Sequence, residues 1–146
     1  MIELTSAQIE QVRRHGEADF PHECCGLLIG TLERALDTGG RKVVREVFPI
    51  SNAREESAKR NRFLITPEEV MRGEKHARQI KLDVVGFYHS HPDCAAVPSQ
   101  FDLDHAWPVY SYVIVSVMKG QAAEVLSWEL RPDRSKFDPE EIVKGL

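Results

Sequence analysis

Two stretches of the chain place apolar residues at helical spacing, and each follows a capping signal. Thr5 stands before the first stretch with Gln8 three residues later, which is the pattern of a reciprocal capping box. We therefore predict a helix from this point to about Ala18. The run Thr66-Pro67-Glu68-Glu69 repeats the pattern, with proline at the first helical position. Four residues beyond it share one face of a second predicted helix: Val70, Gly73, Ala77 and Ile80.

Shorter apolar runs predict strands. Residues 83–90 and 111–117 carry apolar side chains at both odd and even positions, which is typical of strands buried on both faces. Residues 124–130 instead alternate between apolar and polar side chains, as a half-exposed strand does. The predicted strands cover residues 25–30, 42–48, 62–65, 83–90, 111–117 and 124–130.

The order of these elements predicts an α/β fold with a single mixed β-sheet flanked by helices. A chain of 146 residues fits one domain, and we predict a single domain over residues 1–146. Residues 131–146 follow the last predicted strand and are rich in proline and charge at their start. We expect them to form a C-terminal tail or a short helix.

Composition and charge narrow the classes of partner. The net charge is −4 and no basic cluster stands out, so a nucleic-acid partner is not expected. The mixed-charge run at 54–60 is predicted to be a solvated loop. The first residues have neither a basic nor an apolar signal region, so we do not expect a secretion signal. The longest apolar stretch, at 109–118, is half the roughly 20 residues of a membrane span. We therefore expect a cytoplasmic protein with no membrane partner.

The three cysteines do not carry the predicted chemistry. Cys24, Cys25 and Cys94 are odd in number and lack a C-x-x-C spacing, so neither a disulfide framework nor a structural zinc site is expected.

Two histidines lie at the end of the most apolar predicted strand. Residues two apart on a strand point to the same face, so His89 and His91 can reach one metal ion. Pro92 follows and is expected to end regular pairing, which suits a strand that opens into a loop. Strand ends of this kind commonly carry the active sites of α/β sheets.

A third ligand is predicted in the run Ser99-Gln100-Phe101-Asp102. Ser followed three residues later by an acid is also a capping box, and a helix that begins there could direct Asp102 back toward the histidines. Asp104 and His105 are rival ligands. Two imidazoles and one carboxylate make the ligand count of a catalytic zinc site, which keeps a position open for water. Other divalent metals are compatible with the same set.

A hydrolytic zinc site also needs a general base, and the residues alone leave two candidates. Asp93 is close to the histidines in sequence but sits between the ligands. Glu23 is distant in sequence and stands at the start of the predicted strand at 25–30, where an ordinary surface acid would look the same.

The complete set of residues resembles the JAMM motif of MPN-domain (Mov34/JAB) metalloproteases. The motif corresponds to Glu23 before the glycine-containing strand, then His89-Ser90-His91-Pro92, then Ser99-Gln100-Phe101-Asp102. Seven residues separate His91 from Ser99, as the family pattern requires. The resemblance covers about residues 3–130 and implies the MPN (JAB, cytidine-deaminase-like) fold.

The resemblance also implies a role for each matching residue. His89, His91 and Asp102 would bind one zinc ion. Glu23 would act as the general base and then donate the proton to the leaving amine. Ser99 would donate a hydrogen bond to the developing oxyanion. The implied reaction is amide hydrolysis by attack of water, with no covalent adduct of the enzyme.

Small size makes the chain most similar to the compact prokaryotic members of the family. This similarity implies a peptidase or isopeptidase that cleaves after the C-terminal Gly-Gly of a ubiquitin-like or sulfur-carrier protein. One alternative is a zinc peptidase for another extended peptide, of phage-tail or cell-wall type. A non-catalytic MPN interaction domain is a second alternative. A base deaminase is a third, but its P-C-x-x-C string is absent.

Overall fold

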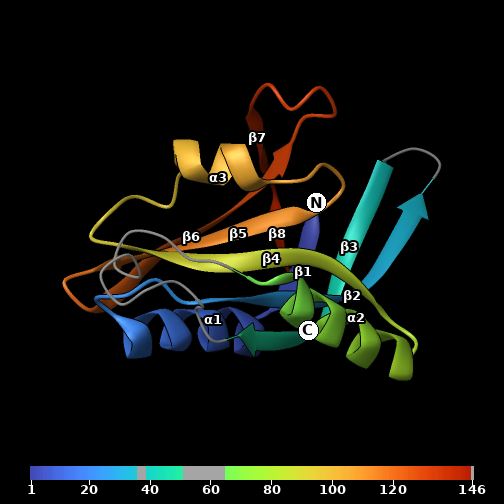
Figure 1. Cartoon of the computed structure of the whole chain (residues 1–146), viewed down its shortest axis with the longest axis horizontal. Coiled ribbons are helices and arrows are strands. Elements are labelled where there is room, and N and C mark those ends of the chain that lie inside the picture. The colour runs from blue at the N-terminus through green and yellow to red at the C-terminus, as the bar shows by residue number, and fades with distance from the viewer. Residues whose placement is uncertain (36–38, 51–64, 146) are drawn as a thin grey trace.

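The computed structural model describes residues 1–35, 39–50 and 65–145, which form one eight-stranded mixed sheet with three helices (Figure 1). The predicted fold class, a single mixed sheet flanked by helices, is confirmed. The strands are β1 (Ile2–Thr5), β2 (Cys25–Ala35), β3 (Gly39–Ile50), β4 (Asp83–Pro92), β5 (Ser111–Met118), β6 (Gln121–Leu130), β7 (Phe137–Glu140) and β8 (Ile142–Gly145). The helices are α1 (Ser6–Asp19), α2 (Pro67–Gln79) and α3 (Gln100–His105).

The strand order across the sheet is β7-β6-β5-β4-β2-β3-β1-β8. β4 lies in the middle, antiparallel to β2 and parallel to β5. A strand with neighbours on both sides has its backbone hydrogen bonds satisfied along its length, so its end is held firmly in place. The two histidines at the end of β4 therefore project from an interior strand of the sheet.

Helices α1 and α2 begin where the sequence predicts. Thr5 caps α1 and Thr66 caps α2, and in both cases the residue three positions later returns a side-chain hydrogen bond to the capping backbone. The first helix runs to Asp19, one residue beyond the predicted end. Gly73 and Ala77 of α2 are buried as expected, but Ile80 at the end of the helix is 43% exposed.

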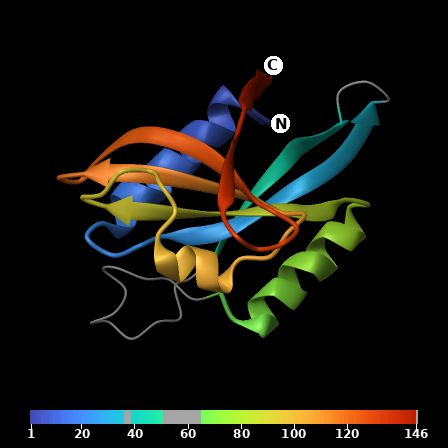
Figure 2. The same cartoon turned by 90° about the horizontal axis from the view of Figure 1, so that it is seen from above.

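The two faces of the sheet carry different helices, as Figure 2 shows from above. Leu28 and Tyr88 belong to the core that also contains Val12 of α1. Leu27 and Phe87 belong to apolar clusters on the opposite face, toward α2 and α3. Adjacent residues on a strand point to opposite faces, so the apolar residues of both parities in β2 and β4 fill two separate cores.

A glycine sets how closely β2 and β4 can pair. Gly26 lies opposite Tyr88 in the β2–β4 register. A Cβ atom at Gly26 would lie 2.2 Å from Cε1 of Tyr88, far inside van der Waals contact. The tyrosine ring therefore packs flat over the glycine, and this pair accepts no larger residue at position 26 without a shift of the ring.

The C-terminal segment corrects one prediction. Residues 131–146 were expected to form a tail or a short helix, but β7 pairs with β6 and β8 pairs with β1. Glu140 explains part of this outcome, because its side chain is 1% exposed and accepts a hydrogen bond of 2.7 Å from Ser127. Lys42 lies 3.6 Å from the same carboxylate. These partners lie far away in sequence, so local pattern gave no signal for the strands.

Other strand predictions differ in detail. β2 and β3 are longer than predicted, and β1 was not predicted. β6 was expected to be half-exposed, but Ser127 on its polar parity is buried because β7 covers it. The predicted strand at 62–65 falls largely outside the described residues, as does the predicted loop at 54–60. Within the described ranges, no helix combines the length and apolar character needed to cross a membrane.

Candidate metal centre

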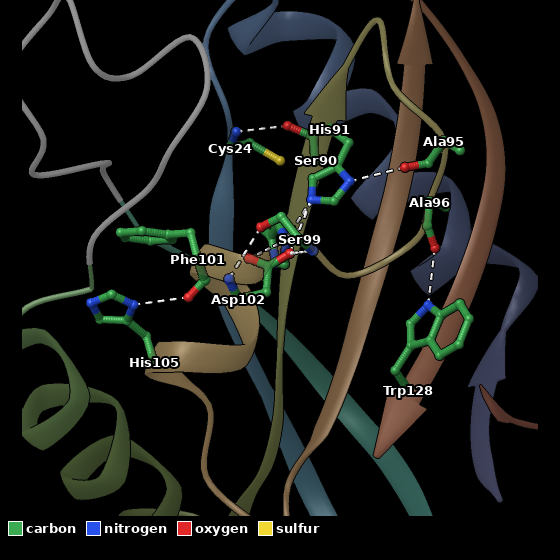
Figure 3. A network of polar contacts seen from close by, with 11 residues as sticks. Cys24, Ser90, His91, Ala95, Ala96, Ser99, Phe101, Asp102, His105 and Trp128 are labelled. Carbon is green, nitrogen blue, oxygen red and sulfur yellow. Dashed lines mark hydrogen bonds and ion pairs between the residues drawn. The ribbon is translucent and has the colours of Figure 1, made fainter. Parts of the chain in front are cut away.

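His89 and His91 occupy the end of β4 and point to the α3 face of the sheet. Ser90 between them points to the other face, where its Oγ accepts a hydrogen bond of 2.8 Å from the backbone N–H of Cys24 (Figure 3). The backbone N–H of Ser90 in turn donates to the carbonyl of Cys24 over 3.2 Å. These bonds tie the end of β4 to the start of β2, so the strand that carries the histidines cannot slide relative to the residues before β2.

Three side chains converge at this strand end. Nε2 of His89 lies 3.1 Å from Nε2 of His91 and 3.2 Å from Oδ1 of Asp102. Nε2 of His91 lies 3.2 Å from Oδ2 of Asp102. One ligand atom from each residue lies within 4.8 Å of the other two, and all three residues are buried. Two imidazole nitrogens and a carboxylate oxygen thus face a common centre.

The third candidate ligand, the carboxylate of Asp102, is held by a helix cap. The backbone N–H of Asp102 donates to Oγ of Ser99 over 3.1 Å, and the backbone N–H of Ser99 donates to Oδ2 of Asp102 over 2.8 Å. The capping box predicted at this position therefore forms. The cap and the convergence on the histidines use the same carboxylate. The two interpretations of this motif, helix cap and ligand, are both compatible with the structure.

A hydrogen bond at His91 and burial at His89 favour the forms in which a histidine binds a metal. Nδ1 of His91 lies 2.9 Å from the carbonyl of Ala95, so the proton belongs on Nδ1 and Nε2 presents a lone pair. Burial lowers the pKa of His89 below its ordinary value, although Asp102 opposes that shift. A neutral imidazole is the form that binds metal.

The side chain of Asp102 is instead held in its charged form. Burial acts to raise the pKa of its carboxyl, but His89, His91 and the backbone N–H of Ser99 together hold that pKa well below its usual range. The carboxylate is therefore ionised at neutral pH, as a metal ligand must be.

Glu23 reaches the same region through the pairing of β2 with β4. Cys25 lies opposite His89 in the register, so the residue two positions earlier comes to the open end of the strand pair. Glu23 is 5% exposed, and with His91 and Ser99 it lines an open pocket of about 380 Å³. The structure thus brings the two predicted catalytic residues into one pocket with a predicted ligand.

The rival residues lie elsewhere. Asp93 has a left-handed backbone with φ of 55°, and its carboxylate accepts a hydrogen bond of 2.7 Å from the backbone N–H of Lys119. Asp104 is exposed and accepts from Gln100 over 2.8 Å. His105 is also exposed and lies 2.8 Å from the carbonyl of Phe101 through Nδ1. Each of these three side chains already has a hydrogen-bond partner at the protein surface.

The cysteines offer no competing site among the described residues. Burial raises the pKa of the Cys24 thiol to about 12, and it raises that of Cys25 further. Thiols of this kind stay protonated and are poor ligands and nucleophiles. Cys94 is exposed and lines the pocket that contains Glu23. Within the described ranges, the group of potential ligands that converges is His89, His91 and Asp102.

The sequence did not predict the hydrogen bonds that hold the loop between the histidines and α3. The carbonyl of Ala96 accepts a hydrogen bond of 2.9 Å from the indole Nε1 of Trp128 on β6 (Figure 3). Oγ of Ser116 on β5 donates to the carbonyl of Cys94. With the bond from His91 to Ala95, three successive carbonyls are held by three elements. These contacts join residues far apart in sequence, so the sequence contains no local signal for them.

Comparisons with known proteins identify a matching family model and several similar sequences. The family model for prokaryotic homologs of the JAB domain matches residues 5–131. A desampylase of Haloferax volcanii is 36% identical over 109 residues, which cover 74% of this chain and 72% of the relative. A desampylase of Pyrococcus furiosus is 31% identical over 123 residues, which cover 83% and 75%. The tail tip assembly protein K of Escherichia phage N15 is 29% identical over 94 residues, which cover 64% of this chain and 32% of that protein.

Solved structures share the fold over nearly the whole chain. A protein of Desulfitobacterium hafniense has a TM-score of 0.82 at 31% identity, with coverage of 99% of this chain and 93% of that one. A JAB1/MPN domain protein of Archaeoglobus fulgidus has a TM-score of 0.55 at 16% identity, with coverage of 97% and 95%. The second match bears on the fold alone. The resemblance expected from the sequence is confirmed, and the chain belongs to the family of prokaryotic homologs of the JAB domain.

Proposed function

We infer that the chain is a zinc-dependent peptidase or isopeptidase that hydrolyses an amide bond after the C-terminal Gly-Gly of a ubiquitin-like or sulfur-carrier protein. The observation that carries this proposal is the convergence of His89, His91 and Asp102 beside a pocket lined by Glu23 and Ser99. Three protein ligands leave a coordination position for water, which distinguishes catalytic from closed structural zinc sites.

The donor set fits zinc. Imidazole nitrogen and carboxylate oxygen are both common zinc ligands, and burial favours the neutral form of His89, which is the form that binds metal. A zinc ion held by these residues supplies Lewis acidity, which lowers the pKa of a water ligand toward about 7 and polarises the scissile carbonyl. The remaining steps belong to residues of the chain itself.

Glu23 is proposed as the general base and acid. Its carboxylate takes a proton from the attacking water and delivers that proton to the leaving amine nitrogen as the amide bond breaks. A positioned carboxylate contributes about 10²–10⁴-fold to such a reaction. The position of Glu23 supports this role, because it is 5% exposed and lines the same pocket as His91 and Ser99.

Ser99 is proposed to stabilise the oxyanion. Its Oγ accepts from the backbone N–H of Asp102, which leaves the hydroxyl hydrogen available to donate to the substrate. Capping and oxyanion stabilisation use opposite ends of the same O–H group, so one serine can perform both. Loss of a single oxyanion donor costs about 10²–10³-fold in turnover in a well-organised site.

The substrate class rests on similarity. Two desampylases are among the relatives, each covering more than two thirds of both chains at over 30% identity. We extend from them the proposal of a ubiquitin-like substrate that ends in Gly-Gly. A second candidate, a peptidase for another extended peptide, is favoured by the similarity to the phage tail tip assembly protein.

The test is a cleavage assay with zinc-loaded protein. Its substrates are a Gly-Gly-ended ubiquitin-like carrier with a short C-terminal extension, the same carrier in isopeptide linkage to a lysine, and an unrelated extended peptide. Glu23→Gln is expected to keep zinc and to lose about 10²–10⁴-fold in turnover. Glu124→Gln, at an exposed position of β6, is the matched control and should retain normal rates.

Three results would contradict the proposal. The absence of near-stoichiometric zinc in the purified protein after reconstitution would favour a non-catalytic interaction domain. Normal turnover by Glu23→Gln would remove Glu23 as the base. Cleavage of the unrelated peptide in preference to the carrier would favour the second candidate.

A further inference from the structure

A second open pocket adjoins the one that contains Glu23. Its volume is about 250 Å³, and its walls include Trp128, Lys136 and Phe137. Both pockets are lined by Val97 and Ser99, so they meet at this short stretch of chain. Val97 is 50% exposed and stands between them. An extended peptide that leaves the first pocket over Val97 would enter the second.

The second pocket has one charged side chain in its lining, and that charge is positive. Lys136 lies at the end of the connection between β6 and β7, and the same pocket is lined by Gln100 and Leu103 of α3. Two other cations of the same connection are engaged. Nε of Arg131 lies 3.0 Å from Asp138, and the guanidinium of Arg134 lies 5.1 Å from the ring centroid of Trp107.

Lys136 differs from these two arginines. Within the described part of the chain, no carboxylate lies within ion-pair distance of its ammonium group. Asp138 acts on it only from a longer range, and both carboxylate oxygens of Asp138 already accept from Arg131. The pocket therefore offers a cation that can gain a partner from a bound molecule.

We propose that Lys136 binds the C-terminal carboxylate of the segment that the enzyme removes. This assignment rests on the proposed peptidase function and specifies its substrate further. The occupant of the second pocket is a short peptide extension whose free carboxylate lies against the ammonium group.

The position of Glu23 sets the direction of the substrate. Glu23 donates its proton to the leaving amine, so the leaving residue must begin in the first pocket. The acyl side, which carries the folded body of the substrate, then lies on the opposite side of the scissile bond. The leaving segment continues over Val97 toward Trp128 and Lys136.

This arrangement separates two kinds of substrate. A C-terminal extension of a few residues ends in a carboxylate that can reach Lys136. An isopeptide-linked protein presents instead a lysine side chain that continues into a folded body without a nearby carboxylate. We therefore expect the site to favour removal of short C-terminal extensions over isopeptide cleavage.

The experiment compares two forms of one substrate. A Gly-Gly-ended carrier is made with extensions of one to five residues, each with a C-terminal acid or a C-terminal carboxamide. At one extension length we expect the wild-type protein to cleave the acid about fivefold more efficiently, the scale of one exposed ion pair. The preference should appear in KM and should shrink as salt is added.

Variants assign the preference to Lys136. Lys136→Gln should cleave the acid and the carboxamide with equal efficiency, and Lys136→Arg should restore the preference for the acid. Lys144→Gln, on the opposite edge strand β8, is the matched control and should leave it unchanged. The same acid and amide peptides are also titrated against zinc-loaded Glu23→Gln, so that binding is measured without turnover.

The outcomes keep the two proposals apart. If acid and carboxamide are cleaved and bound equally at every length, the role of Lys136 is overturned while the peptidase function stands. If no carrier is cleaved by the wild-type protein, the proposed function fails. Acid preference in the binding titration would then still support a carboxylate site at Lys136, and its absence would overturn that site as well.

Discussion

Helices α2 and α3 begin with the same device but serve different ends. Thr66 and Glu69 close a capping box at α2, and Ser99 and Asp102 close one at α3. In α2 the acid of the box bonds to Thr66 alone among the contacts described. In α3 the acid also approaches His89 and His91 at 3.2 Å each. The tertiary neighbours of the carboxylate, and not the motif, decide what it does.

The two helices also differ in how they are held. α2 has 13 residues, whereas α3 has 6, a length at which an isolated helix is not stable in water. Leu103 of α3 and Ala106, which caps its C-terminus, pack against Tyr112 and Phe137, and Asp102 anchors the first turn of α3 to β4. A short helix that depends on its neighbours should therefore respond to a metal bound at Asp102, and α2 should not.

Removal of zinc should produce the largest difference in stability between the two helices. At zinc concentrations about a thousandfold above Kd, the free energy of unfolding should exceed that of chelated protein by about 4 kcal/mol. Denaturant unfolding measures this difference. Hydrogen exchange should show faster exchange of α3 amides after chelation and little change in α2. Equal loss of protection in both helices would contradict the comparison.

Substitution of each capping acid by alanine should have the next largest effect, and this effect is on zinc affinity. Asp102→Ala removes a ligand, so zinc affinity should fall at least about a hundredfold, the upper range for loss of even a supporting residue. Glu69→Ala removes only a capping partner and should leave zinc affinity unchanged. Competition with a chromophoric chelator measures both variants. Unchanged affinity in Asp102→Ala would return Asp104 and His105 to consideration.

Substitution of each capping hydroxyl residue by alanine should have the smallest effect on stability. Thr66→Ala and Ser99→Ala should each lower the free energy of unfolding by about 1 kcal/mol, the common cost of a lost cap. Only Ser99→Ala should also reduce turnover, with little loss of metal content. Thermal unfolding and the cleavage assay on the same samples measure the two effects. Equal turnover in both variants would leave Ser99 with a capping role alone.

The features that the sequence predicted well depend on near neighbours. A capping box spans four residues, so the starts of α1, α2 and α3 were all visible. His89 and His91 are two apart on one strand, and strand parity alone predicts that they face one point. Asp102 was predicted by the same local logic, but only the structure distinguishes it from Asp104 and His105.

The features that escaped prediction depend on distant pairing. Glu23 could not be separated from Asp93 by residue spacing, because its position follows from β2 pairing with a strand some 60 residues later. β7 and β8 were missed because Glu140 is buried only in the presence of Ser127 and Lys42. A charged side chain in a proline-rich segment gives no sign of such a partner in the sequence itself.

The contact between Gly26 and Tyr88 has a consequence for mutational tolerance. In a saturation library selected for activity, position 26 should tolerate substitution as poorly as the metal ligands, because an added side chain there meets the ring of Tyr88. Any side chain there displaces the tyrosine ring, and that displacement shifts the alignment that brings Glu23 beside the histidines. Intolerance at Gly26 should therefore be relieved by a smaller residue at position 88, whereas intolerance at a ligand cannot be relieved by any second change nearby.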